Sequence, residues 1–363
     1  MAEIFFASSL YSLIGGLWLT RSGHARHTQA LILGLVLCFA LSLLAGLNFQ
    51  WVVFEQKFAS TFAFDLFEGH DPAARRPTFL LQTLVNWPVF SLTGVWWAAI
   101  GTNIAILVLG FILFARHDPR LALWLLAPAL VNFSLFSLRD PLIAALCFVL
   151  ALGLLDPLIW RRALGQAVGA VAFLLVRPEN VVLLVLANAL AVVIEKWRTM
   201  WGALLLPLAA VAAVYGGQFA PQALGLDGVV RFWDLPLVLN EFFTSRAERW
   251  GAELGGGSNI LGGALTELGF LPRYAIQIAS FFVLPFPFEI TSWLLAMAFV
   301  DSLVFIALSV QAHRVGPAKI LGFFWVYVLA VSLFSANYGN VFRMRLPAYS
   351  LLLAALFAGR VRR

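Results

Sequence analysis

Arginines and acidic residues gather in short clusters where apolar segments of this chain begin or end. A guanidinium group suits phosphate, because it is permanently charged and donates two parallel hydrogen bonds. A carboxylate at the same place can act as a general base on a hydroxyl group. The clusters therefore predict a site for a phosphate or diphosphate ligand, with Arg139, Arg177, Arg343 and Arg345 as its phosphate-binding residues.

Acidic residues near these clusters supply the candidates for acid–base chemistry. The predicted catalytic residues are Asp65, Asp71, Asp140 and Glu179. Further contacts to a glycan are predicted from polar residues nearby, namely Arg75, Arg76, Arg246, Arg249, Asn337, Tyr338 and Glu289. A purely structural alternative stays open, in which Arg139 pairs with Asp140 and Arg177 pairs with Glu179.

Composition places these residues in a membrane protein. The chain has 363 residues, of which 62% are hydrophobic and only 12% are charged. Soluble domains average about 45–50% apolar and about 25% charged residues, so a soluble fold is excluded. The net charge of +6 therefore does not indicate nucleic acid. Two cysteines and five scattered histidines give no soft-ligand metal site, although a divalent cation held by oxygen ligands stays compatible.

The apolar segments predict an all-α polytopic membrane protein with about eleven transmembrane helices, within a range of ten to twelve. Short basic clusters break the segments, and the positive-inside rule assigns these clusters to the cytoplasm. The N-terminus is then outside and the C-terminus cytoplasmic. The predicted spans are 4–20, 28–48, 95–115, 121–137, 141–156, 163–176, 181–194, 202–217, 291–311, 318–335 and 346–359.

The remaining segments belong to one transmembrane domain covering residues 1–363. Stretches 78–94 and 270–290 are apolar but contain prolines, which predicts interfacial or re-entrant half-helices. The first outer loop is 49–94, including its interfacial helix. A large outer loop and half-helix, 218–290, would cover a membrane cavity.

Helix lengths place some of the outer arginines at membrane depth. The run 163–176 before Arg177 has 14 residues, which span about 21 Å against a hydrocarbon core of about 30 Å. The run 346–359 after Arg345 is equally short. Ionisable groups at that depth need a polar cavity or a partner. Asp301, inside span 291–311, is a functional candidate for the same reason, and its alternative is a hydrogen bond to a nearby Ser or Tyr.

Four motifs together resemble a family pattern. They are Ser134-Leu135-Phe136-Ser137-Leu138-Arg139-Asp140, Arg177-Pro178, Pro285-Phe286-Pro287-Phe288-Glu289, and Asn337-x-Gly339-x3-Arg343-x-Arg345-x-Pro347. The set resembles the bacterial Wzy-like and EpsG-like polysaccharide polymerases, which are related in architecture to GT-C glycosyltransferases. The first outer loop departs from the paired-acid motif of GT-C enzymes.

The resemblance implies a glycosyltransferase or polymerase of the bacterial inner membrane, acting on its periplasmic face. The donor would be a glycan linked to undecaprenyl diphosphate, and membrane lipid and other polysaccharide-assembly proteins are further expected partners. Two other functions stay open from the residues alone. One is a transporter or flippase for a lipid-linked sugar or an anion, and the other is a membrane acyltransferase relying on His70.

Overall fold

The computed structural model describes residues 2–21, 25–47, 64–65, 67–69, 79–136, 138–177, 179–197, 270–332 and 338–361. These residues form helices and turns, with no strand among them. Five of the helices contain segments long and apolar enough to cross a membrane: α1 (Ala2–Thr20), α2 (Ala25–Leu47), α6 (Ala98–Ala115), α16 (Trp293–Val315) and α18 (Tyr338–Val361). The helical membrane class agrees with the sequence, whereas eleven spans and their sidedness stay predictions.

Seven further helices do not meet the length and hydropathy of a membrane span. They are α5 (Leu80–Thr93), α9 (Asp140–Gly153), α10 (Ile159–Leu174), α11 (Glu179–Trp197), α15 (Phe270–Val283), η6 (Pro287–Glu289) and α17 (Ala318–Ser332). α5 coincides with the half-helix predicted at 78–94, and α15 with η6 coincides with the one at 270–290. The predicted span 202–217 and residues 218–269 of the large loop lie outside the described residues.

The predicted single helix at 121–137 is wrong. The chain there forms three short pieces, α7 (Pro119–Ala122), η3 (Leu123–Leu126) and α8 (Pro128–Ser134). Pro128 has no N–H to donate to the preceding turn and disfavours helical backbone at Ala127. Ala127 accordingly adopts a ψ of 137°, which separates η3 from α8.

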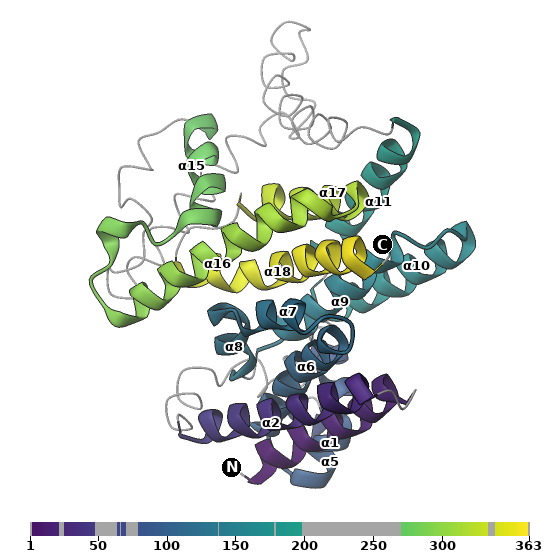
Figure 1. Cartoon of the computed structure of the whole chain (residues 1–363), viewed down its shortest axis with the longest axis vertical. Helices are drawn as coiled ribbons and strands as arrows, with labels where there is room; N and C mark the ends of the chain where they lie inside the picture. Colours follow the sequence, from purple (N-terminus) through teal and green to yellow (C-terminus); the bar gives the residue numbers. More distant parts are fainter. Residues whose placement is uncertain are drawn as a thin grey trace, which may run out of the picture.

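Figure 1 shows the helices stacked along the longest axis of the molecule. α16, α17 and α18 lie together, with α9 below α18 and α10 to the right, while α1, α2 and α5 lie at the other end of the stack beyond α6. α6 packs on α1 and α2, and α18 packs on α9, α16 and α17. At Gly101 in α6 an added Cβ would lie 2.4 Å from the carbonyl oxygen of Ile4 in α1. The absence of a side chain there lets the two backbones meet, as is common between membrane helices.

Basic residues mark one common end of this bundle. Arg116, after α6, donates from Nη1 to the carbonyl oxygen of Leu19 at 2.5 Å, near the end of α1. Arg360, at the end of α18, pairs with Asp118 at 3.3 Å, just beyond α6. The helix ends that carry basic residues in the sequence thus meet in space. The opposite ends of α9, α10 and α18 carry the clusters singled out for chemistry.

Candidate functional site

Asp140 is the centre of an arginine cluster formed by three helix ends. It is the first residue of α9, and its side chain is only 1% exposed. Arg343, in the second turn of α18, donates from Nε to Oδ2 of Asp140 at 2.6 Å. Nη1 of Arg177, which follows α10, lies 3.6 Å from Oδ1 of Asp140. One carboxylate therefore joins the beginnings of α9 and α18 to the end of α10.

Arg139 extends the cluster through a hydrogen bond to the backbone and a contact with an aromatic ring. Its Nη1 donates to the carbonyl oxygen of Val176 at 2.8 Å, next to Arg177. Its guanidinium also lies over the ring of Phe79, 5.0 Å from the ring centroid, a cation–π arrangement. Phe79 directly precedes α5, so the half-helix predicted at 78–94 begins beside the cluster.

Asn103 of α6 holds the loop that leads into the cluster. Its Nδ2 donates to the carbonyl oxygen of Phe136 at 2.6 Å and to that of Leu138 at 2.8 Å. Asn103 is itself buried. Its amide therefore supplies hydrogen bonds to two backbone carbonyl oxygens that are shielded from water. Sequence reasoning did not find this residue, since an amide in the first turns of an apolar helix carries no motif of its own.

Among the described side chains, the cluster has more positive than negative charge, and it is partly open. Arg177 and Arg343 contact the carboxylate of Asp140, and their side chains are 15% and 34% exposed. Among the described residues, Nε is the only nitrogen of Arg343 with a hydrogen-bond acceptor. Its two terminal nitrogens are therefore available to an added anion, which a guanidinium binds in a bidentate manner.

Arg345 belongs to a second, closed network two residues along α18. Its side chain is fully buried and donates to the carbonyl oxygens of Phe281 at 2.7 Å and Leu284 at 3.0 Å. Nη1 donates to Oγ of Ser302 at 2.8 Å and lies 3.5 Å from Oδ2 of Asp301. A guanidinium enclosed in this way joins α15, α16 and α18 rather than facing a ligand, which corrects the expectation that Arg345 binds phosphate.

Asp301 anchors the break between η3 and α8. Its Oδ1 accepts hydrogen bonds from the backbone N–H of Ala129 at 2.8 Å and from the hydroxyl of Tyr349 at 2.9 Å. The bond to tyrosine is the structural alternative considered from the sequence, and it is present. Asp301 thus satisfies an N–H in the first turn of α8, which has no partner within its own helix.

The other predicted residues lie apart from the cluster or outside the described residues. Asp65 is half-buried, and its neighbour Phe64 packs on Phe90 near the end of α5. Phe90 lies eleven positions after Phe79 along α5, a rise of about 16 Å. Glu289 accepts a hydrogen bond from the N–H of Phe286 at 2.7 Å and caps η6. The residues outside the described part of the chain are His70, Asp71, Arg75, Arg76, Arg246, Arg249 and Asn337, and the side chains of Glu179 and Tyr338 are likewise not described.

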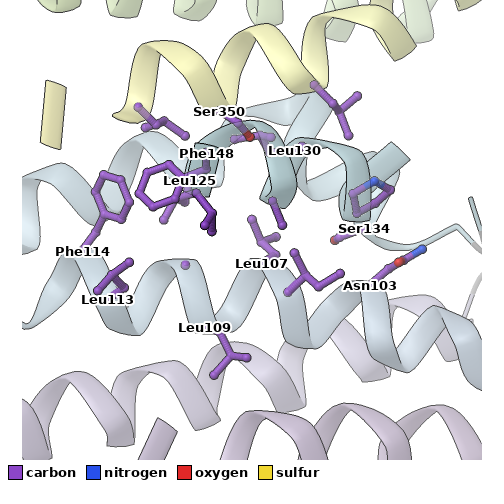
Figure 2. A pocket seen from close by; sticks show the side chains of 18 of the residues that line it. Asn103, Leu107, Leu109, Leu113, Phe114, Leu125, Leu130, Ser134, Phe148 and Ser350 are labelled. Atoms are coloured by element: carbon purple, nitrogen blue, oxygen red, sulfur yellow. The ribbon is translucent and has the colours of Figure 1, made fainter. Parts of the chain in front are cut away.

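An apolar cavity begins beside the cluster and extends along α6. Its volume is about 290 Å³. Figure 2 shows Asn103 and Ser134 at one end and Phe114 at the other, with Leu107 and Leu130 between them. α9 and α18 complete the walls. The end of the cavity that carries Asn103 and Ser134 lies nearest to Asp140. Asn103 donates to the carbonyl oxygen of Leu138, and Pro141, which follows Asp140, belongs to the lining.

Comparisons with family models, curated proteins and solved structures give no match for this chain. Among the described residues, no group of three or more His, Cys, Asp or Glu side chains is placed to hold a metal ion.

Proposed function

We propose that this chain is a membrane glycosyltransferase that takes its sugar from a polyprenyl-diphosphate-linked donor and transfers it to a hydroxyl acceptor. The observation that carries the proposal is the arginine cluster around Asp140, in which the described side chains place Arg139, Arg177 and Arg343 at helix ends beside one buried aspartate. A ligand for this cluster must carry negative charge and reach the membrane. A lipid-linked diphosphate meets both requirements, and the four sequence motifs favour the same donor.

In the proposed reaction the bond between the sugar C1 and the diphosphate oxygen breaks. The acceptor hydroxyl oxygen forms the new bond to C1, and its proton passes to a carboxylate. The leaving diphosphate keeps the electron pair of the broken bond. Arg343, Arg177 and Arg139 stabilise the negative charge that develops on it, because preorganised cations act most strongly where water is scarce.

Asp140 has an orienting role in this scheme. Both of its oxygens already face arginines, so it fixes the guanidinium groups of Arg177 and Arg343, and the terminal nitrogens of Arg343 face the ligand. The general base is then an acid whose side chain is not described, with Asp71 and Glu179 as the candidates. We place the site on the periplasmic side of the bacterial inner membrane, opposite the basic helix ends, in agreement with the positive-inside rule.

The test compares two arginines of the same helix. Arg343→Gln and Arg360→Gln each remove one charge from α18, and each residue pairs with an aspartate at similar exposure, 34% and 40%. Losing a charge-assisted hydrogen bond of about 1.5–3 kcal/mol weakens binding about 10- to 100-fold. We expect this loss for polyprenyl diphosphate with Arg343→Gln and no change with Arg360→Gln, measured on purified protein in nanodiscs.

A turnover assay separates the proposal from transport. Purified protein with a polyprenyl-diphosphate-linked glycan and an acceptor should release polyprenyl diphosphate and form a new glycosidic bond. Movement of the intact donor across a vesicle membrane without bond formation would identify a flippase instead. Full turnover by both Arg343→Gln and Arg177→Gln would also contradict the proposal.

A further inference from the structure

The apolar cavity along α6 continues from the arginine cluster into the membrane-spanning part of the bundle. Pro141 lines the cavity and directly follows Asp140, while Leu346 lines it and lies three residues after Arg343. From Asn103 to Phe114 the cavity follows twelve residues of α6, whose end-to-end rise is about 16 Å. A ligand whose charged end contacts the cluster would therefore have its next segment beside this cavity.

The lining of the cavity suits a hydrocarbon ligand. It consists mainly of Leu, Ile, Ala and Phe side chains from α6, α9 and α18. Two of its polar groups are already used inside the protein, since Ser134 donates to the carbonyl oxygen of Val131 and Asn103 donates to two loop carbonyls. Water needs two to four polar partners to occupy a cavity, and an apolar chain needs none.

We infer that this cavity holds the first isoprene units of the lipid carrier, an inference that rests on the proposed function. A volume of about 290 Å³ is at the lower end of the range of about 300–1,000 Å³ for small-molecule pockets. The cavity therefore takes only the part of the chain next to the diphosphate, and the remainder lies in the bilayer. Bound in this way, the isoprenoid chain fixes the position of the diphosphate relative to Arg343.

Gly110 offers a substitution that fills the cavity with little disturbance. It lies in the middle of α6, and an added Cβ would meet the methyl carbons of Leu125 at 3.6 Å, an ordinary van der Waals distance. A leucine at this position extends into the space that the chain would occupy. Gly165 in α10 is a matched control, because an added Cβ there meets no atom within 4 Å.

The experiment measures three probes on the full chain in nanodiscs: long-chain polyprenyl diphosphate, the uncharged polyprenol, and inorganic diphosphate. We expect Gly110→Leu to weaken binding of both polyprenyl compounds at least tenfold and to leave inorganic diphosphate unchanged. Arg343→Gln should weaken both diphosphates and leave polyprenol unchanged. Gly165→Leu should bind all three as the wild type does.

Two results would overturn the inference. One is wild-type affinity of Gly110→Leu for both polyprenyl compounds. The other is equal competition by phosphatidylglycerol, which would identify the occupant as ordinary bilayer lipid. If the wild type binds polyprenol but neither diphosphate, the proposed function fails while the cavity assignment stands. Should Gly110→Leu fold poorly, Ala145→Phe fills the same cavity from α9 and the same outcomes apply.

Discussion

Replacing Arg345 by methionine should destabilise the protein far more than replacing Arg360, although both arginines lie in α18 and pair with an aspartate. The two ion pairs have similar lengths, 3.5 Å for Arg345–Asp301 and 3.3 Å for Arg360–Asp118. Their surroundings differ, because the Arg345 side chain is fully buried while the Arg360 side chain is 40% exposed. Burial alone should therefore separate the two effects.

The magnitude follows from the groups that lose a partner. Arg345→Met leaves the Asp301 carboxylate buried, although Ala129 and Tyr349 still donate to it. Breaking a buried pair by removing one partner costs about 3–5 kcal/mol. The carbonyl oxygen of Phe281 also loses its donor from Arg345, whereas that of Leu284 still accepts a hydrogen bond from the hydroxyl of Ser302. We expect a loss of about 4 kcal/mol, against at most about 1 kcal/mol for the exposed pair.

The assay is reversible unfolding of the purified protein in mixed micelles, followed by tryptophan fluorescence. The informative third variant is Arg345→Met combined with Asp301→Asn, because removal of both charges leaves no unpaired ion. It should be more stable than Arg345→Met alone, since neutral replacements of buried pairs are often tolerated. If Arg345→Met costs no more than Arg360→Met, or the double variant recovers nothing, the account of this network is incorrect.

Three further predictions concern the frame around the site. Gly101→Ala should lower stability by about 1–3 kcal/mol, because its Cβ would lie 2.4 Å from the backbone oxygen of Ile4; unchanged thermal unfolding would contradict the close approach of α1 and α6. Asn103→Leu should cost about 1–3 kcal/mol in the same measurement, because two buried loop carbonyls lose their donor. Burial, and to a smaller extent the charge of Arg116, lowers the pKa of His117 in the folded protein. As the pH falls, His117 is therefore protonated in the unfolded chain before it is protonated in the folded protein. Stability from neutral His117 is present above about pH 6.5 and is lost as the pH falls toward the lowered folded pKa. His117→Phe should remove this decline in the thermal midpoint, and a decline of equal size in the variant would contradict the assignment.

Local patterns in the sequence predict most of the described helices. Long apolar runs indicate α1, α2, α6, α16 and α18, because a helix that meets lipid must be apolar over its length. Prolines mark the half-helices at α5 and α15. The same signal was available at Pro128, where hydropathy alone predicts one continuous span. Hydropathy averages over a window and therefore does not register the missing N–H that divides η3 from α8.

The pairing within the candidate site was not predictable in this way. The sequence offers Arg139 and Asp140 as a pair because they are adjacent, yet the main partner of Asp140 is Arg343, 203 residues away. Arg345 has no acid beside it in the sequence and still meets Asp301, 44 residues earlier. Such contacts depend on which helices become neighbours, and that depends on packing along their whole length. Residue type predicts phosphate-binding arginines, whereas tertiary packing decides which of these arginines lie beside Asp140 and which are enclosed.

The outer surface of α10 has a consequence for the bilayer itself. Apart from Arg161, its exposed side chains are apolar, including Trp160, Val168 and Leu174, while Gln166 is buried. The apolar length between Arg162 and Arg177 is 14 residues, about 21 Å, which is several ångströms less than a typical hydrocarbon core. A bilayer that meets this helix must thin beside it or let the helix ends be covered by neighbouring chains. Thinning lowers the headgroup layer toward Arg177, so lipid phosphate groups would lie at the depth of the arginine cluster. The activity proposed above should therefore depend on the acyl-chain length of the host membrane.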